Sequence, residues 1–417
     1  MEKSLSFREV EVIMQSAVLS GVKVLDLTTF LAAPQCGRAL AALGADVIKV
    51  EAPEKDFFRI ESPLFEVGIP CTDDENPIFL NTNAGKRFIT MNLKDPRCKE
   101  VVRKLIEQSD ILITNMRTAA LEKLGIGYEQ AHEWNPRLVY GHLDGYGQKG
   151  AEAPKPGFDS QAYLARGGYL LDLTEEGCTP NEQVLGMGDS ATGIALLSGV
   201  LASFVRAQTT GQGSFVNISL LNTAMWNGLM HHTLLQYGIE PQTTRKKPIG
   251  FAVANNYQCK DGTWINLNTS QGLMKTWKDL CEAVGVPELV DDERFNTPEK
   301  QRENRAEATA ILDGIFAQKN FEEWDAILSK VDIAYERTAH LLDVTRDPQA
   351  LENNYFIQRD YPSGKSIKVA AVPFQMEGIH EDLTKPIHFG GHTREILQEL
   401  GYAEEIIDQM YQDKAIM

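Results

Sequence analysis

The chain has 417 residues, of which 43% are hydrophobic and 24% charged, and its formal net charge is −17. This length exceeds what one compact core usually supports, so we expect two globular domains, and the acidic excess disfavours nucleic acid and anionic membranes as partners. Residues 1–21 mix charges with apolar residues, and no stretch has the ~18 uninterrupted apolar residues of a membrane span, so we expect a cytoplasmic protein.

The first third of the chain alternates strand and helix patterns. Residues 21–27 and 44–51 are predicted strands on either side of a small-residue helix at 35–43, and this order forms a βαβ unit with parallel strands. The pattern continues with strands at 88–93, 111–114 and 138–141 and with a helix at 95–108 that begins at Pro96. Such alternation predicts a doubly wound sheet that binds ligands where loops leave the carboxyl ends of its strands.

A glycine-flanked aspartate, Asp189, precedes a long helical pattern of apolar residues at 194–205. Free N–H groups and the helix dipole at such a start favour a negative charge, and Gly186 and Gly188 remove side chains that would block a substrate. We therefore predict Asp189 as a catalytic nucleophile. An ordinary N-cap role explains this local pattern equally well.

The second half of the chain changes character. A strand at 214–220 and a helix at 221–237 are followed by a basic connector at 243–248, a hairpin at 257–267 that turns at Asp261-Gly262, and helices at 272–284, 302–317 and 321–330. The tail has a strand at 367–372 and a helix at 393–400. We predict an α/β protein in which 1–225 begin a large domain, 226–340 form the connector and a small α+β domain, and 341–417 return to the large domain.

Several short motifs occur in order along nearly the whole chain. They are 21–27 (GVKVLDL), 33–34 (AP), 44–51 (GADVIKVE), 83–87 (NAGKR), 91–94 (MNLK), 110–115 (DILITN), 145–147 (GYG), 156–159 (PGFD), 186–189 (GMGD), 209–213 (TTGQG) and 260–262 (KDG). Their order and spacing resemble the class III CoA-transferase family of CaiB/BaiF type. The runs at 165–168 (ARGG) and 145–150 (GYGQKG) look closest to the anaerobic 2-hydroxyacyl-CoA transferases, such as the phenyllactate and 2-hydroxyisocaproate enzymes.

The resemblance implies a Rossmann-like large domain with a parallel sheet, a smaller α+β domain, and two subunits threaded as interlocked rings. It implies CoA transfer from a 2-enoyl- or 2-hydroxyacyl-CoA to a free (R)-2-hydroxy acid in amino-acid fermentation, with Asp189 as nucleophile and aspartyl anhydride and aspartyl-CoA thioester intermediates. No tightly bound cofactor and no metal are expected; CoA is a substrate. The implied CoA contacts are Leu31, Ala32, Leu93, Lys94, Asn115, Met116, Lys123, Gly157, Phe158 and Asp159, with Lys94 and Lys123 as candidates for the phosphates.

Three departures and two alternatives bear on the substrate. A glutamine and an arginine of the formyl-CoA member correspond to Leu31 and Ala52, and its glycine-rich flap is absent near Ile249-Gly250, which favours a more apolar acyl pocket. A related acyl-CoA racemase uses a histidine before the aspartate at Asp159, where this chain has Phe158, a side chain that cannot carry a proton. A non-catalytic acyl-CoA-binding protein would have lost its nucleophile.

Overall fold

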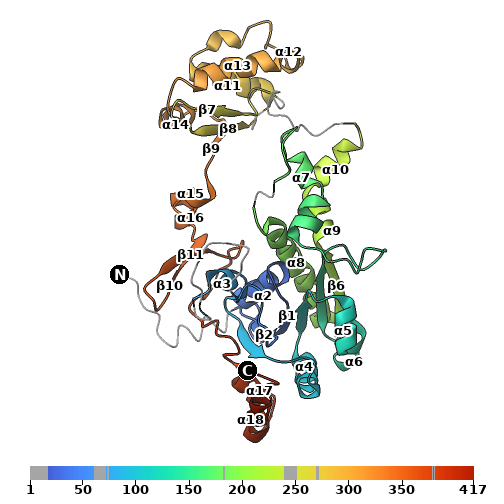
Figure 1. Ribbon diagram of the computed structural model, residues 1–417. Coiled ribbons are helices and arrows are strands. Elements are labelled where there is room, and N and C mark those ends of the chain that lie inside the picture. The colour runs from blue at the N-terminus through green and yellow to red at the C-terminus, as the bar shows by residue number, and fades with distance from the viewer. Residues whose placement is uncertain are drawn as a thin grey trace. The chain divides into compact units, whose positions relative to one another are not determined.

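The computed structural model describes residues 17–60, 72, 75–181, 184–238, 251–268, 272–377, 379 and 381–417 (Figure 1). Most of the N-terminal segment, Cys71, the basic connector at 243–248 and the Ile249-Gly250 position lie outside these residues. By its internal contacts the chain forms two units. Unit 1 consists of Met1–Leu171, Pro180–Ile239 and Gln349–Met417, and unit 2 of Asp172–Thr179 and Glu240–Pro348.

Unit 1 contains a six-stranded sheet whose order is β3-β2-β1-β4-β5-β6. Its strands are β1 (Lys23–Leu27), β2 (Asp46–Glu51), β3 (Arg87–Thr90), β4 (Ile111–Thr114), β5 (Val139–Asp144) and β6 (Ser214–Ser219). Every neighbouring pair is parallel. This order is that of a Rossmann fold, in which the direction of winding reverses between β1 and β4. The predicted parallel α/β sheet is confirmed.

Helices cover both faces of this sheet, because its central strands are apolar on both sides. Val24 of β1 packs in the cluster that contains α2 (Ala32–Ala42) and α8 (Met187–Thr210), whereas the next residue, Leu25, packs in the cluster that contains α4 (Pro96–Gln108). Among the described residues α8 is the helix long and apolar enough to cross a membrane, but here it packs on α2, β5 and β6.

Several helices differ from the sequence prediction, including the one predicted at 302–317, which forms α12 (Pro298–Glu303) and α13 (Arg305–Phe316). Helix α2 begins at Ala32 rather than at residue 35, because Pro34 fits the first turn of a helix, where its missing N–H is not needed. The apolar stretch at 221–237 forms two helices, α9 (Leu220–Asn227) and α10 (Leu229–Leu235), that meet at Gly228. The remaining helices between β2 and α8 are α3 (Pro77–Asn83), α5 (Thr118–Leu124), α6 (Tyr128–Trp134), the π-helix η2 (Asp159–Ala165) and α7 (Tyr169–Asp172).

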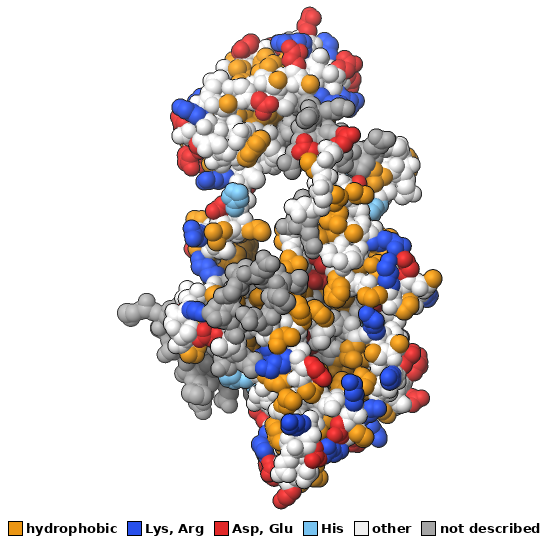
Figure 2. Space-filling view, viewed as in Figure 1, with side chains coloured by type: hydrophobic (Ala, Val, Ile, Leu, Met, Phe, Trp, Pro, Cys, Tyr) orange, Lys and Arg blue, Asp and Glu red, His pale blue; other side chains and the backbone are white. Residues whose placement is uncertain are grey.

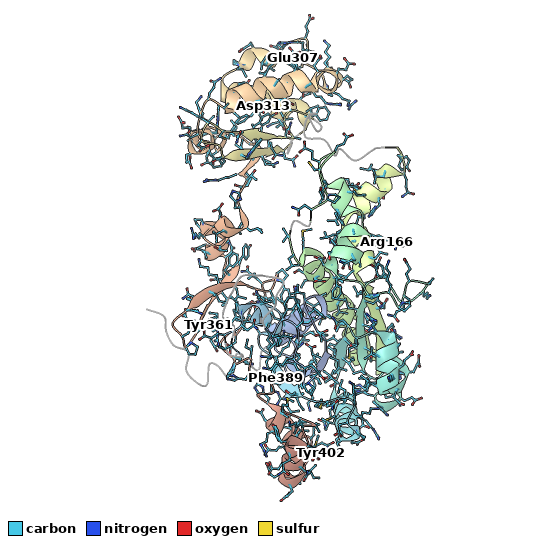
Figure 3. The ribbon with its side chains drawn as sticks, viewed as in Figure 1. Arg166, Glu307, Asp313, Tyr361, Phe389 and Tyr402 are labelled. Carbon is cyan, nitrogen blue, oxygen red and sulfur yellow. The ribbon has the colours of Figure 1, made fainter. Side chains whose placement is uncertain are left out.

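The C-terminal residues complete unit 1. They form α16 (Pro348–Glu352), the antiparallel pair β10 (Phe356–Asp360) and β11 (Ser366–Ala370), α17 (Thr393–Glu399) and α18 (Glu404–Gln412). Helix α17 packs on β3, and Ile416 forms a β-bridge with Met91. Tyr402 lies between α17 and α18 (Figure 3). The Lys104 ammonium nitrogen is 4.1 Å from the centroid of its ring.

Unit 2 has a separate apolar core around a three-stranded antiparallel sheet. The strands are β7 (Asn256–Gln258), β8 (Trp264–Asn268) and β9 (Ala334–Arg337), and the predicted turn at Asp261-Gly262 joins the first two. Its helices are α11 (Leu273–Val284), the 3-10 turn η3 (Pro287–Leu289), α12 (Pro298–Glu303), α13 (Arg305–Phe316), α14 (Phe321–Leu328) and α15 (Leu341–Val344). The buried indoles of Trp277 and Trp324 donate to the carbonyls of Leu289 and Phe316. Their polar atoms are therefore satisfied within the core.

Candidate active site

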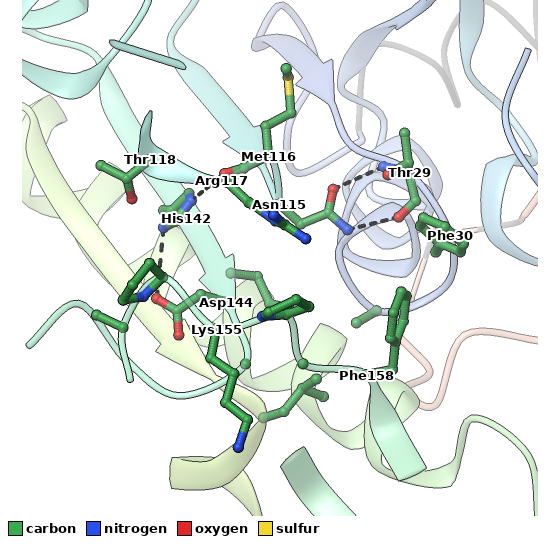
Figure 4. A pocket seen from close by; sticks show the side chains of 18 of the residues that line it. Thr29, Phe30, Asn115, Met116, Arg117, Thr118, His142, Asp144, Lys155 and Phe158 are labelled. Atoms are coloured by element: carbon green, nitrogen blue, oxygen red, sulfur yellow. Dashed lines mark hydrogen bonds and ion pairs between the residues drawn. The ribbon is translucent and has the colours of Figure 1, made fainter. Parts of the chain in front are cut away.

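A cavity of about 620 Å³ opens in unit 1 at the carboxyl ends of the central strands (Figure 4). Its walls come from the loops after β1, β4 and β5 and from the start of α8, at residues 29–32, 115–119, 122, 142–145, 148, 153–158, 189 and 220. The loops after β1 and β4 flank the point where the strand order reverses. Open α/β sheets bind their ligands at this point.

Asp189 contributes a carboxylate to this cavity from the first turn of α8. The helix begins at Met187, and its N-cap is Gly186 with φ at 73°, so the N-cap interpretation of Asp189 is wrong. Gly186 takes the cap because a residue without a Cβ adopts this left-handed conformation freely, and an added Cβ would also lie 2.9 Å from Leu31 Cδ1. Asp189 still lies where an anion is favoured, because the N–H groups of the first turn lack intrahelical acceptors.

Glycines allow α8 to approach its neighbours closely on both sides of Asp189. A Cβ on Gly188 would lie 2.2 Å from Asp159 Oδ1 and 2.2 Å from Tyr163 Cγ, and a Cβ on Gly193 would lie 2.5 Å from the Ala32 carbonyl oxygen. Distances below 3.0 Å leave no room for a side chain. These glycines therefore bring the first turns of α8 against η2 and against the start of α2.

Two further glycines let the loops of the cavity cross. A Cβ on Gly145 would lie 2.8 Å from Gly157 Cα, and a Cβ on Gly157 would lie 2.9 Å from Gly145 Cα. The GYG and PGFD motifs therefore meet backbone to backbone. Any side chain at either position would separate the end of β5 from the loop that carries Phe158.

His142, at the end of β5, has both ring nitrogens in hydrogen bonds. Its Nε2 lies 2.8 Å from the Met116 carbonyl oxygen and must donate to it, so Nδ1 accepts from Gln148 Nε2 at 2.9 Å (Figure 4). The same Gln148 amide donates to Asp144 Oδ2 at 2.6 Å, and Asn217 donates to that oxygen at 2.8 Å. His142 therefore connects the β4 and β5 loops and has neither nitrogen available as a base.

The wall that faces α8 contains a strained aromatic residue. Phe30 has φ at 65°, a conformation that a bulky side chain rarely adopts. Its ring stacks on Phe57 at 5.5 Å between centroids and meets Phe158 edge to face at 5.3 Å. Phe158 is half exposed, so these rings present an apolar surface to the cavity.

The structure brings together seven of the predicted site residues in this cavity, namely Leu31, Ala32, Asn115, Met116, Gly157, Phe158 and Asp189. Asp159 is buried as the first residue of η2, next to Gly188. Leu93, Lys94 and Lys123 do not line the cavity. Leu93 packs partly buried beyond the edge strand β3, and the exposed Lys123 lies in the last turn of α5, past the residues of that helix that line the wall.

Sequence reasoning missed two basic residues of the cavity wall, Arg117 and Lys155. Arg117 is exposed at the N-cap of α5, and Lys155 lies with its ammonium 5.2 Å from the ring centroid of Tyr146. Arg117 directly follows the predicted contact Met116, and Lys155 directly precedes Pro156 of the PGFD motif. These neighbours were the available signal. Arg117 and Lys155 supply the local basic surface that an anionic ligand of this acidic protein requires.

Comparison with known proteins assigns this arrangement to a class of enzyme. The chain matches CoA-transferase family III over residues 19–393 and belongs to that family. Among curated proteins it is 36% identical to an (R)-2-hydroxy-4-methylpentanoate CoA-transferase of Clostridioides difficile, over 96% of this chain and 99% of the relative. It is also 36% identical to a cinnamoyl-CoA:phenyllactate CoA-transferase of Clostridium sporogenes, over 96% of this chain and 97% of that enzyme.

A solved structure supports the fold assignment. The crystal structure of a CaiB/BaiF family protein from Brucella suis superimposes with a TM-score of 0.75 at 29% sequence identity, covering 91% of this chain and 98% of that one. The protein is thus a family III CoA-transferase with the fold of the CaiB/BaiF proteins.

Proposed function

We propose that this enzyme moves CoA from a 2-enoyl- or 2-hydroxyacyl-CoA to a free (R)-2-hydroxy acid and that Asp189 is its nucleophile. The observation that carries the proposal is the position of Asp189 in the first turn of α8, at the wall of the cavity. The other carboxylates of that wall suit the role less, because Asp144 ends β5 and Glu122 lies in the second half of α5, so neither is in the first turn of a helix.

The chemistry requires an acyl acceptor that is itself a carboxylate, because each intermediate must be about as activated as the thioester. The Asp189 carboxylate attacks the donor thioester carbonyl, which forms a mixed anhydride and releases the CoA thiolate. The thiolate then attacks the aspartyl carbonyl and releases the donor acid, leaving an aspartyl-CoA thioester. The acceptor carboxylate attacks this thioester, which forms a second mixed anhydride and releases the CoA thiolate. The thiolate then attacks the acceptor acyl carbonyl of the anhydride, which forms the new acyl-CoA and releases the Asp189 carboxylate. Backbone N–H groups near Gly186 and Gly188 would stabilise the oxyanions.

An acceptor with an apolar side chain fits this cavity. Phe30, Leu31 and Phe158 line the wall, and Leu31 replaces a glutamine of the formyl-CoA enzyme. The relatives named above act on 2-hydroxy acids with a branched aliphatic or an aromatic side chain. We therefore propose phenyllactate or 2-hydroxy-4-methylpentanoate as acceptors.

For the CoA moiety we propose contacts with the predicted residues of the wall, and Arg117 and Lys155 as phosphate ligands. Leu93, Lys94, Lys123 and Asp159 remain predicted CoA contacts.

Acyl exchange with covalent trapping tests the proposal. The purified chain is incubated with cinnamoyl-CoA and (R)-phenyllactate, or with 4-methylpentenoyl-CoA and (R)-2-hydroxy-4-methylpentanoate. We expect it to form the 2-hydroxyacyl-CoA, which mass spectrometry detects. Hydroxylamine added with the donor should leave a hydroxamate on the peptide that contains Asp189, because both intermediates are activated acyl groups. Modification of any other peptide contradicts this assignment. Deuterium incorporation at the α-carbon without an added acid would instead indicate a racemase.

We further propose a cytoplasmic homodimer of the interlocked kind. Apolar side chains gather on the surface where α7 and α9 lie (Figure 2). On α9, on α10 and just after it, Trp226 is 72%, Met230 65% and Tyr237 83% exposed. Exposed apolar residues in such a group are typical of protein interfaces. Light scattering from the purified protein should give twice the chain mass of 46.4 kDa, and a monomer would contradict the proposal.

A further inference from the structure

The backbone of the loop after β1 is held by side chains from β1, from β2 and from the loop after β4. The Thr28 N–H donates to Asp26 Oδ1 at 2.9 Å, and the Thr28 carbonyl accepts from Lys49 Nζ at 2.7 Å. The Thr29 N–H donates to Asn115 Oδ1 at 2.9 Å, and Asn115 Nδ2 returns a bond of 2.7 Å to the Thr29 carbonyl. The backbone N–H and carbonyl groups of both Thr28 and Thr29, which precede Phe30, are therefore fixed by side chains.

Lys49 reaches this loop from within the sheet. It lies on β2, its side chain is 0% exposed, and its ammonium nitrogen is 3.5 Å from Asp56 Oδ2. A buried ammonium is costly unless charged and polar groups surround it. A lysine at this position therefore needs a role that an apolar strand residue could not fill. Its hydrogen bond to the Thr28 carbonyl is such a role.

Lys86 holds the other end of the same segment. Its Nζ donates to Asp26 Oδ2 at 2.7 Å, to Asn83 Oδ1 at 2.8 Å and to the Pro34 carbonyl in the first turn of α2 at 2.9 Å. Burial lowers the pKa of Lys86 to about 8, although Asp26 opposes this shift. Burial also acts to raise the pKa of Asp26, but the charges of Lys86 and Lys49 outweigh it and hold that pKa below its usual value.

We propose that Lys49 and Lys86 are positioning residues for CoA transfer, which clamp the two ends of the Thr28–Pro34 segment so that it faces Asp189. The segment between the clamps carries Phe30 in its strained conformation and Leu31, whose Cδ1 lies close to Gly186. Strained backbone persists where its surroundings over-determine it. This inference rests on the proposed function of the cavity, and it assigns a role to the NAGKR motif, which contains Lys86.

Replacing Lys49 by methionine, which has a similar unbranched shape, tests the clamp. We expect kcat to fall by roughly 10²-fold while KM for the acceptor changes by only a few fold, because a displacement of about 1 Å in a reacting geometry has such an effect. Amide hydrogen exchange of the peptide at 27–36 should become faster. Lys86→Met should also lower kcat and speed up exchange at 27–36. If the Lys86→Met variant fails to fold, the result for Lys49→Met decides whether the clamp exists.

Arg87→Met is the matched control, since Arg87 is the neighbour of Lys86 but pairs with Asp46 and Glu399, neither of which lines the cavity. It should lower stability while leaving kcat and exchange at 27–36 as in the wild type. Equal effects of Arg87→Met and Lys49→Met on kcat and exchange would overturn the proposal, as would an unchanged kcat in Lys49→Met. If the wild type transfers no CoA, the proposed function fails, and the exchange comparison alone still decides whether the lysines hold the loop.

Discussion

Asp189→Asn and Asp189→Ala are expected to lower kcat for CoA transfer by at least roughly 10⁴-fold, the loss typical of removing an enzyme's nucleophile. An amide or a methyl group cannot form the mixed anhydride, so neither variant can enter the first step. Affinity for CoA should change little, because six other predicted contacts of the cavity wall remain in place. Initial rates of acyl exchange, together with calorimetric titration of CoA, measure the two quantities separately.

Glu122→Gln provides the control for the Asp189 variants. It also removes a carboxylate from the wall of the cavity, but from an exposed position on α5. We expect its kcat to stay within a few fold of the wild type. Undiminished transfer by Asp189→Ala, or a hydroxamate that still forms in that variant, would rule out Asp189 as the nucleophile.

Gly188→Ala is expected to have the second largest effect. The new methyl group would lie 2.2 Å from both Asp159 Oδ1 and Tyr163 Cγ, so η2 or the first turn of α8 must move. Overpacking of this kind typically lowers the free energy of unfolding by about 1–3 kcal/mol. Because the displaced turn carries Asp189, kcat should also fall by roughly 10²-fold. Chemical denaturation and exchange kinetics check the two effects.

Gly314→Ala is the matched control, because Gly314 is also a helical glycine but has no atom within 4 Å of an added Cβ. It should leave kcat unchanged and raise the free energy of unfolding by roughly 0.5–1 kcal/mol, since alanine is the better helix former. If Gly188→Ala behaved like Gly314→Ala, the close packing of α8 on η2 would not determine the position of Asp189.

The elements that sequence reasoning predicted best are those with strong local signals. Strand β4 lies at the predicted 111–114, α4 begins at Pro96 as expected, and the hairpin turns at Asp261-Gly262. Each depends on a run of apolar residues, a proline or a turn pair within a few residues, so short-range physics suffices. The start of α8 near Asp189 belongs to the same group, although the cap residue proved to be Gly186.

The order of the strands decided how the motif residues are grouped. Asn115 and Met116 follow β4, which lies beside β1, and so they reach the cavity. Lys94 follows the edge strand β3 and does not line it. In the linear sequence these positions look alike, because Asn115, Met116 and Lys94 all follow a strand. Only the reversal of winding between β1 and β4 separates them.

What the sequence by itself determined is therefore the family, the parallel α/β sheet and the helix start that carries Asp189. Only the tertiary structure decided the hydrogen bonds by which His142 joins two loops, the crossing of Gly145 and Gly157, and the burial of Lys49 and Lys86. The physical reason is distance along the chain. Lys86 bonds Asp26 and Pro34 across 60 and 52 residues, and no local pattern distinguishes a lysine with such partners from one exposed to water.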